Sequence, residues 1–128
     1  MPTLTNLLGT GSSPLAAQAI MGMATAASLG LTAAGNSQGT ALALTSDFNV
    51  VTTCASSAGV ILPASGPNVN ITDVWSVTNY GANTLSVYPP TGGKIANGSA
   101  NAAFSVAAGK TALFWSIGSG NWTALLSA

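Results

Sequence analysis

The chain has 128 residues, of which 48% are hydrophobic and only 3% charged, and two Lys and two Asp leave a net charge of zero. It contains no His, Glu or Arg, so it lacks the most frequent general base of enzymes, the ligand clusters of zinc sites and the positive field that nucleic acid requires. We therefore expect a protein that is not an enzyme, has no cofactor or metal, binds no nucleic acid and forms lasting assemblies, because uncharged surfaces do not repel one another.

Residues 1–36 are predicted to form an N-terminal arm, because their composition differs from that of residues 37–128. Ser13 suits an N-cap and Pro14 suits the first helical position, so a short helix is expected from about Pro14 to Ala24. The arm carries more apolar side chains than so short a segment can bury by itself. They are predicted to contact a partner, first of all a capsid surface: Leu4, Leu7, Leu8, Leu15, Ile20, Met21 and Met23.

A membrane span is the alternative interpretation of part of this arm. Residues 15–34 carry no charge over about the length that crosses a bilayer. The segment also contains Gln18, several Thr and Ser and two Gly, and no Lys or Arg precedes it to orient an insertion. We therefore expect no membrane association and an arm that packs on another protein.

From Gly39 onward the pattern changes to alternating apolar and polar residues with frequent turn residues, which is typical of short β-strands. Strands are predicted over residues 40–45, 48–54, 59–62, 70–78, 84–88, 94–96, 102–107, 110–117 and 122–126. Eight or nine short strands indicate an all-β protein, a jelly-roll-like β-sandwich over residues 37–128. Tight hairpins are expected at YGAN and GSGN, and a wide corner at PPTGG.

The strand predicted over residues 110–117 has apolar side chains on both faces. Leu113, Trp115 and Ile117 alternate with Ala112 and Phe114, so neither face suits water. Burial inside one domain and burial between subunits both explain this pattern. The second alternative predicts a subunit interface made by Trp75, Leu113, Trp115 and Ile117.

Few other residues suggest chemistry. Cys54 is expected to be a small buried strand residue, since no His could activate its thiol. Asp47 and Asp73 are expected at turns or strand edges. Exposed Trp side chains could stack on sugars, so a glycan-binding module that uses Trp75, Trp115 or Trp122 remains an alternative.

Four segments carry a resemblance to a known class of proteins. They are GTGSSPLAAQAI, TAAGNSQGTALALTSDFNVVTTCASSAGVILP, VTNYGANTLSVYPPTGGKIANG and VAAGKTALFWSIGSGNW. In this order of turns and strands, the chain resembles small β-sandwich virion proteins of tailed bacteriophages, a class that includes capsid decoration (cement) proteins and head-fibre modules. The likeness covers nearly the whole chain, and no functional motif of the class transfers residue by residue.

The resemblance implies a β-sandwich that is commonly trimeric and sits on the outside of an assembled phage head. Such proteins brace neighbouring copies of the major capsid protein, often with an extended terminal arm as anchor. The expectation is therefore a structural virion protein on the capsid exterior, assembled in the cytoplasm of the host cell. A phage fibre module and a β-sandwich that binds host glycans are the alternatives.

Overall fold

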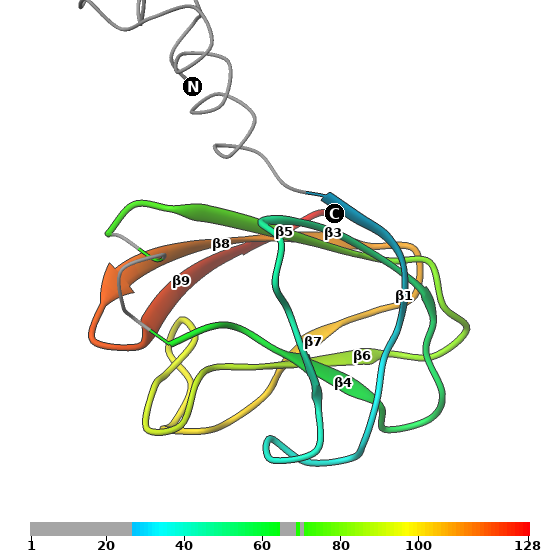
Figure 1. Ribbon diagram of the computed structural model, residues 1–128, viewed down its shortest axis with the longest axis horizontal. Coiled ribbons are helices and arrows are strands. Elements are labelled where there is room, and N and C mark those ends of the chain that lie inside the picture. Colours follow the sequence, from blue (N-terminus) through cyan, green and yellow to red (C-terminus); the bar gives the residue numbers. More distant parts are fainter. Residues whose placement is uncertain (1–26, 65–68, 70) are drawn as a thin grey trace, which may run out of the picture.

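Two mixed β-sheets make up the computed structural model, which describes residues 27–64, 69 and 71–128 (Figure 1). One sheet has the strand order β1-β3-β5-β8-β9 and the other the order β2-β4-β6-β7. The strands are β1 (Ala27–Thr32), β2 (Leu42–Ala43), β3 (Phe48–Thr53), β4 (Gly59–Ile61), β5 (Val74–Asn79), β6 (Leu85–Tyr88), β7 (Phe104–Val106), β8 (Thr111–Gly118) and β9 (Asn121–Leu126). The described residues contain no helix, which confirms an all-β fold for them. The helix predicted over residues 14–24 lies outside the described residues.

From β1 to β6 the chain alternates between the two sheets, and this makes the strand pairs of the first half parallel. β1, β3 and β5 are parallel neighbours in one sheet, and β2, β4 and β6 are parallel neighbours in the other. The later pairs β5–β8, β6–β7 and β8–β9 are antiparallel. Since a jelly roll is built from antiparallel strands, the jelly-roll prediction is not confirmed. The chain instead winds through the two layers in successive turns before it closes them with β7, β8 and β9.

The YGAN segment, predicted as a hairpin, connects β5 to β6 in the opposite sheet, so that prediction is wrong. The side chain of Asn79, which is fully buried, fixes this crossing. Its Oδ1 accepts a hydrogen bond from the Gly81 amide at 2.9 Å, and its Nδ2 donates to the carbonyls of Asn83 at 2.8 Å and Val106 at 2.9 Å. The same turn residues that close a hairpin therefore direct the chain from one layer to the other.

The GSGN segment forms the predicted hairpin between β8 and β9. Ser119 and Gly120 have φ angles of 57° and 77°. Positive φ at both central residues is what a type I′ turn requires, and its twist matches that of the flanking strands.

β1 shows that the two-sheet domain begins before the predicted boundary at residue 37. It pairs with β3 through a bulge, and the Ala33 amide that follows it donates to the Thr53 carbonyl at 2.9 Å. Ala33 belongs to the core, and Ala34 forms a bridge with Gly59. Residues 27–34 are therefore part of the sheets, and the arm can extend only to Ala26.

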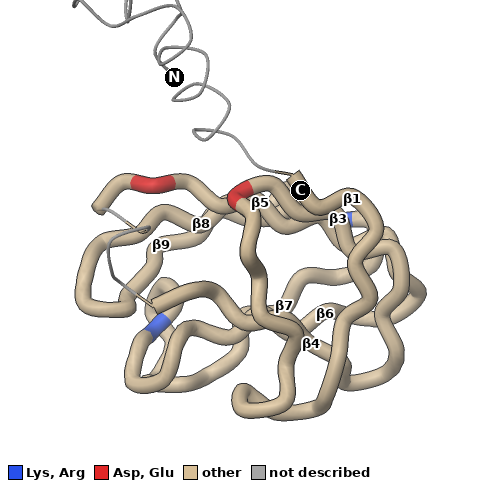
Figure 2. The backbone as a smooth tube through the Cα atoms, in the orientation of Figure 1, with Lys and Arg blue, Asp and Glu red and all other residues tan. Residues whose placement is uncertain are grey.

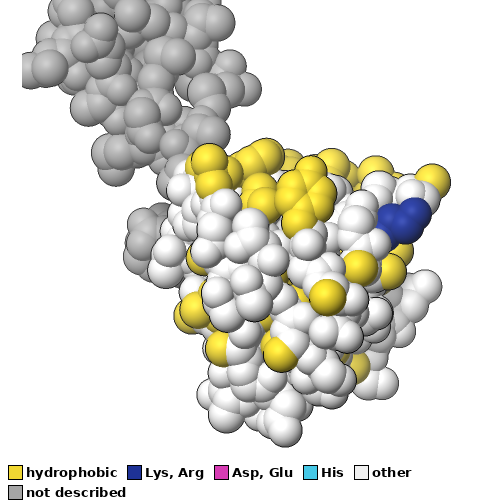
Figure 3. All heavy atoms as spheres, turned by 90° about the vertical axis from the view of Figure 1, so that its right-hand side faces the viewer, with side chains coloured by type: hydrophobic (Ala, Val, Ile, Leu, Met, Phe, Trp, Pro, Cys, Tyr) yellow, Lys and Arg dark blue, Asp and Glu magenta, His cyan; other side chains and the backbone are white. Residues whose placement is uncertain are grey.

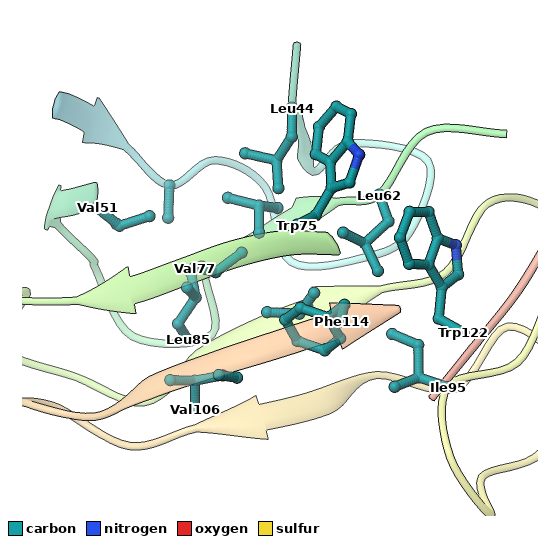
Figure 4. Packing of buried hydrophobic residues seen from close by; sticks show 14 of the residues in the cluster. Leu44, Val51, Leu62, Trp75, Val77, Leu85, Ile95, Val106, Phe114 and Trp122 are labelled. Atoms are coloured by element: carbon teal, nitrogen blue, oxygen red, sulfur yellow. The ribbon is translucent and has the colours of Figure 1, made fainter. Parts of the chain in front are cut away.

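The core lies between the two sheets and is closed by aromatic contacts (Figure 4). The rings of Phe114 on β8 and Phe104 on β7 pack edge to face, with their centroids 5.5 Å apart. This contact joins the two sheets. Trp75 and Trp122 make a second edge-to-face contact at 6.3 Å. Close packing of this kind makes the inner residues sensitive to any loss of volume. Of the strand predicted over residues 94–96, the structure retains one bridge, between Ile95 and Trp122.

Candidate interaction surface

Four neighbouring strands place apolar side chains on the outer face of the five-stranded sheet. Phe48, Ile117 and Leu125 are 46%, 57% and 59% exposed, whereas Phe114 and Trp122 on the inner face of the same sheet are buried. Figure 3 shows hydrophobic side chains gathered along this sheet, at the top of the view. We call this surface the apolar face and define it by Phe48, Val50, Val74, Leu113, Trp115, Ile117 and Leu125.

The strand register makes the apolar face continuous. Phe48 on β3 lies opposite Ser76 on β5, Ser76 lies opposite Leu113 on β8, and Leu113 lies opposite Leu125 on β9. Val74 and Trp115 form a second pair beside this row. Side chains directly opposite each other on a sheet are in contact distance. Together the two rows form one patch across β3, β5, β8 and β9.

The centre of the apolar face is hollowed above Ser76. Asp47, Phe48, Val74, Ser76 and Leu113 line this depression. Ser76 is only 8% exposed, and its Oγ has no hydrogen-bond partner among the described residues. A small residue between larger ones leaves a hole of the kind that receives a partner's apolar side chain.

A polar end borders the apolar face on β5 and β8. The hydroxyls of Thr78 and Thr111 lie opposite each other, and their oxygens are 2.8 Å apart. Beside them, Lys110 donates a hydrogen bond from Nζ to the carbonyl of Ala128. The patch is thus an apolar surface with a polar rim, which is the composition of protein–protein interfaces.

The outer face of the four-stranded sheet provides the contrast. Gly59, Ser86 and Ser105 form one row across β4, β6 and β7 on that face, and Ala43, Ile61 and Tyr88 form the row beside it. Among the described residues, none of the exposed large hydrophobic side chains lies on that face, whereas an exposed apolar face of a sheet is normally covered. The difference between the two outer faces marks the apolar face as the surface that needs a partner.

The four charged residues do not form a site. Asp47 and Asp73 precede β3 and β5, as predicted for strand-edge residues, and Figure 2 marks both backbone positions, in red, along the five-stranded sheet. The backbone carbonyl of Asp47 accepts a hydrogen bond from the Ser76 amide at 2.8 Å, and that of Asp73 accepts one from the Ser116 amide at 3.0 Å. Within the described residues, no group of three or more His, Cys, Asp or Glu could hold a metal ion.

Cys54 is buried, as the sequence predicted. Desolvation raises the pKa of the Cys54 thiol, so the neutral form is favoured. Because only the thiolate is a good nucleophile, Cys54 is a packing residue.

The structure divides the predicted subunit-interface residues between the two faces of the sheet. Leu113, Trp115 and Ile117 lie together on the apolar face. Trp75 pairs with Phe114 and therefore faces the core, where it is 8% exposed and packs on Trp122, so its assignment to the interface is corrected. The predicted capsid-contact residues lie outside the described part of the chain: Leu4, Leu7, Leu8, Leu15, Ile20, Met21 and Met23.

Sequence reasoning missed Phe48, Val74 and Leu125 as members of the apolar face. Phe48 and Val74 are each followed by a buried residue, Asn49 and Trp75, and Leu125 follows the half-buried Ala124. Period-two alternation was therefore the available signal. What the alternation lacked was the order of the strands, which brings these separate side chains together.

The exposure of Trp75, Trp115 and Trp122 decides which of these rings could stack on a sugar. Trp75 and Trp122 are 8% and 1% exposed, and only Trp115 on the apolar face is partly accessible. A ring that stacks on a sugar must be reachable from solvent. Of the three candidates, Trp115 alone meets that condition.

Comparison with known proteins does not add to this picture. No protein-family model, no curated protein and no solved structure matches the chain. In the part of the chain that the structure describes, no helix is long and apolar enough to cross a membrane. The apolar face is therefore the feature from which function is inferred.

Proposed function

We propose that the protein is a structural virion protein, a capsid decoration (cement) protein that binds the outside of an assembled phage head and stabilises it. The observation that carries the proposal is the apolar face, a continuous and mainly apolar surface on one side of a domain with few charges. A free monomer would expose this surface to water, whereas a permanent subunit buries it. The β-sandwich trimer inferred from the resemblance supplies such a setting.

In this proposal the N-terminal segment is the anchor on the major capsid protein. It joins the domain at Ala27, which pairs with Phe48 at the border of the apolar face. Leu4, Leu7 and Leu8 gain roughly 1.5 to 3 kcal/mol each when fully buried on the capsid, and the apolar residues from Leu15 to Met23 gain as much on the capsid or on a neighbouring copy. A few capsid contacts per copy, made together by the linked copies of one trimer, add up to stable attachment.

A fibre module would use the same surfaces in another part of the particle. For host-glycan binding, the accessible ring is Trp115, whose neighbour across the strand pair is Val74. Sugar sites combine an aromatic ring with hydrogen-bonding groups that converge on the ligand. The apolar surroundings of Trp115 therefore favour a protein partner over a glycan.

Attachment to shells is expected to depend little on salt. The chain contributes four charged side chains in all, so few ion pairs are available for screening. Co-sedimentation of the purified protein with heads that lack it, between about 0.05 and 1 M salt, is expected to show less than a threefold change in apparent Kd. Loss of binding at moderate salt, or no binding to heads at any salt, contradicts the proposal.

The isolated protein is expected to be a trimer at micromolar concentration, because association buries the apolar face. Light scattering measures the mass directly. Ile117→Lys, which places a charge on the apolar face, is expected to shift the protein towards monomers at least tenfold. Ser105→Lys, at an exposed position on the outer face of the other sheet, is the control and is expected to keep the trimer. A stable monomer of the unaltered chain contradicts the assignment of the apolar face as an interface between copies.

A further inference from the structure

We propose that residues 14–24 of one copy lie on the apolar face of a neighbouring copy, with an apolar side chain inserted into the depression at Ser76. This inference rests on the proposed function in one respect, since it requires an oligomer. It adds an identity for the occupant of the face and predicts that neighbouring copies interlock.

The N-terminal segment meets the domain next to the apolar face. Twenty-six residues precede Ala27, and they contain no charged side chain. Ala27 lies opposite Phe48, so this uncharged segment starts at the border of the apolar face. A largely apolar segment next to an apolar surface that has Asp47 as the one charged residue lining its depression is chemically matched to it.

The sequence pattern of residues 14–24 fits the surface in shape. Ala16, Ile20 and Met23 recur at the i, i+4 and i+7 spacing that forms one stripe on a helix. Eleven helical residues span roughly 16 Å. The apolar face extends over three interstrand spacings, from β3 to β9, or roughly 14 Å. One helix of this length therefore covers the patch from one side to the other.

The length of the connection favours a neighbouring copy over the same chain. Only Thr25 and Ala26 separate the predicted helix from β1, which is an edge strand. Three Cα steps span at most roughly 11 Å, and raising a helix onto a sheet uses about 10 Å of that reach. Ser76 on β5 lies two strands away from β1, a further distance of roughly 10 Å, of which the four helical steps from Ala24 to Ile20 cover about 6 Å. The same chain therefore reaches Ser76 only with its connection almost fully extended and its helix perpendicular to the strands. A short connection that would be strained when a segment packs on its own chain favours packing of that segment on a neighbouring copy.

Ser76 gives the contact its specificity. It lies between Phe48 and Leu113 in one row, and its hydroxyl has no hydrogen-bond partner among the described residues. The small side chain of Ser76 leaves space between these two larger residues. Ile20 or Met23 on the helix stripe has the size to enter that space.

This arrangement leaves the first part of the segment for the shell. Gly9 and Gly11 separate Leu4, Leu7 and Leu8 from the predicted helix. Glycine disfavours continuous helix, so the two parts can lie on different surfaces. The part near the domain would join copies, and the distal leucines would contact the capsid.

Disulfide trapping between two co-expressed chains tests the inference. Both chains carry Cys54→Ala; one also carries Ile20→Cys, and the other carries Leu113→Cys and a size tag. Mild oxidation is expected to yield the mixed disulfide dimer at least fivefold more than the matched control, in which Ser105→Cys replaces Leu113→Cys. A single chain with both Ile20→Cys and Leu113→Cys is oxidised separately, and light scattering is measured on each sample before oxidation.

The outcomes separate this inference from the proposed function. A mixed dimer from a trimeric sample supports the exchange. A trimer without the mixed dimer overturns the exchange and leaves the oligomer intact. An intrachain disulfide in the doubly substituted chain, without the mixed dimer, shows that the segment covers its own sheet and overturns the exchange. A monomeric sample overturns both the exchange and the oligomer.

Substitution of Ser76 provides a second, independent readout. Ser76→Phe fills the depression and is expected to lower the yield of the mixed dimer at least tenfold. Ser76→Ala keeps the space and is expected to leave the yield within twofold of the parent. Circular dichroism checks that both variants stay folded. Equal yields from the two folded variants would show that the depression receives no side chain.

Discussion

Deletion of residues 2–26 is expected to leave a folded β protein that no longer attaches to heads. Every strand of the described fold starts at Ala27 or later, so the two sheets keep their full set of pairs. The deletion removes seven large apolar side chains, from Leu4 to Met23. Burial of only two of them is worth at least about 3 kcal/mol, which corresponds to a loss of affinity of more than about 100-fold. Co-sedimentation with heads measures the loss, and circular dichroism measures the fold.

Deletion of residues 2–34 is the informative comparison. It also removes β1, which pairs with β3, and Ala33, which lies in the core. The protein with the longer deletion loses an edge strand and its core contacts. We therefore expect it to unfold, or its free energy of unfolding to fall by several kcal/mol. If the shorter deletion binds heads as tightly as the full chain, the sheet surface is the anchor. If the shorter deletion fails to fold, residues 1–26 belong to the domain.

Phe114→Ala is expected to lower the free energy of unfolding by about 3 to 5 kcal/mol. Phe114 is fully buried, and its ring meets that of Phe104 across the two sheets. Truncation removes this contact and leaves a cavity where the layers are joined. Urea unfolding followed by Trp fluorescence measures the change.

Leu113→Ala is the matched control, since Leu113 is adjacent in sequence and points to the opposite side of β8. In a variant made monomeric by Ile117→Lys, Leu113→Ala is expected to cost less than about 1 kcal/mol, the range of surface substitutions. In the unaltered oligomer it is expected to weaken association instead. Similar losses for Phe114→Ala and Leu113→Ala in the monomeric background would contradict the assignment of the two faces.

The positions of most strands could be predicted from the sequence, because alternation and turn residues act locally. β3, β6, β8 and β9 lie within two residues of their predicted ranges. β1 was missed, because Gly30 interrupts its alternation and the strand is paired through a bulge. The pairing of strands depends on residues far apart in the chain, which is why YGAN was assigned to a hairpin and the sheets to a jelly roll.

The candidate surface was predictable in part for the same reason. Alternation in β8 separated Leu113, Trp115 and Ile117 from Phe114 without any knowledge of the partner strands. The side of β5 that faces the core depends on its register with β8, and this register places Trp75 opposite Phe114. Ser76 carries no signal in the sequence at all. Its importance comes from the larger side chains that the register places around it.

An image of the particle at residue resolution would show whether this protein is a subunit on the outside of a phage head. The account predicts density outside the shell that fits the two sheets, with the apolar face covered by a neighbouring copy and the N-terminal segment leading towards the major capsid protein. Particles that lack the chain, or that carry it with the apolar face open to solvent, would contradict the account.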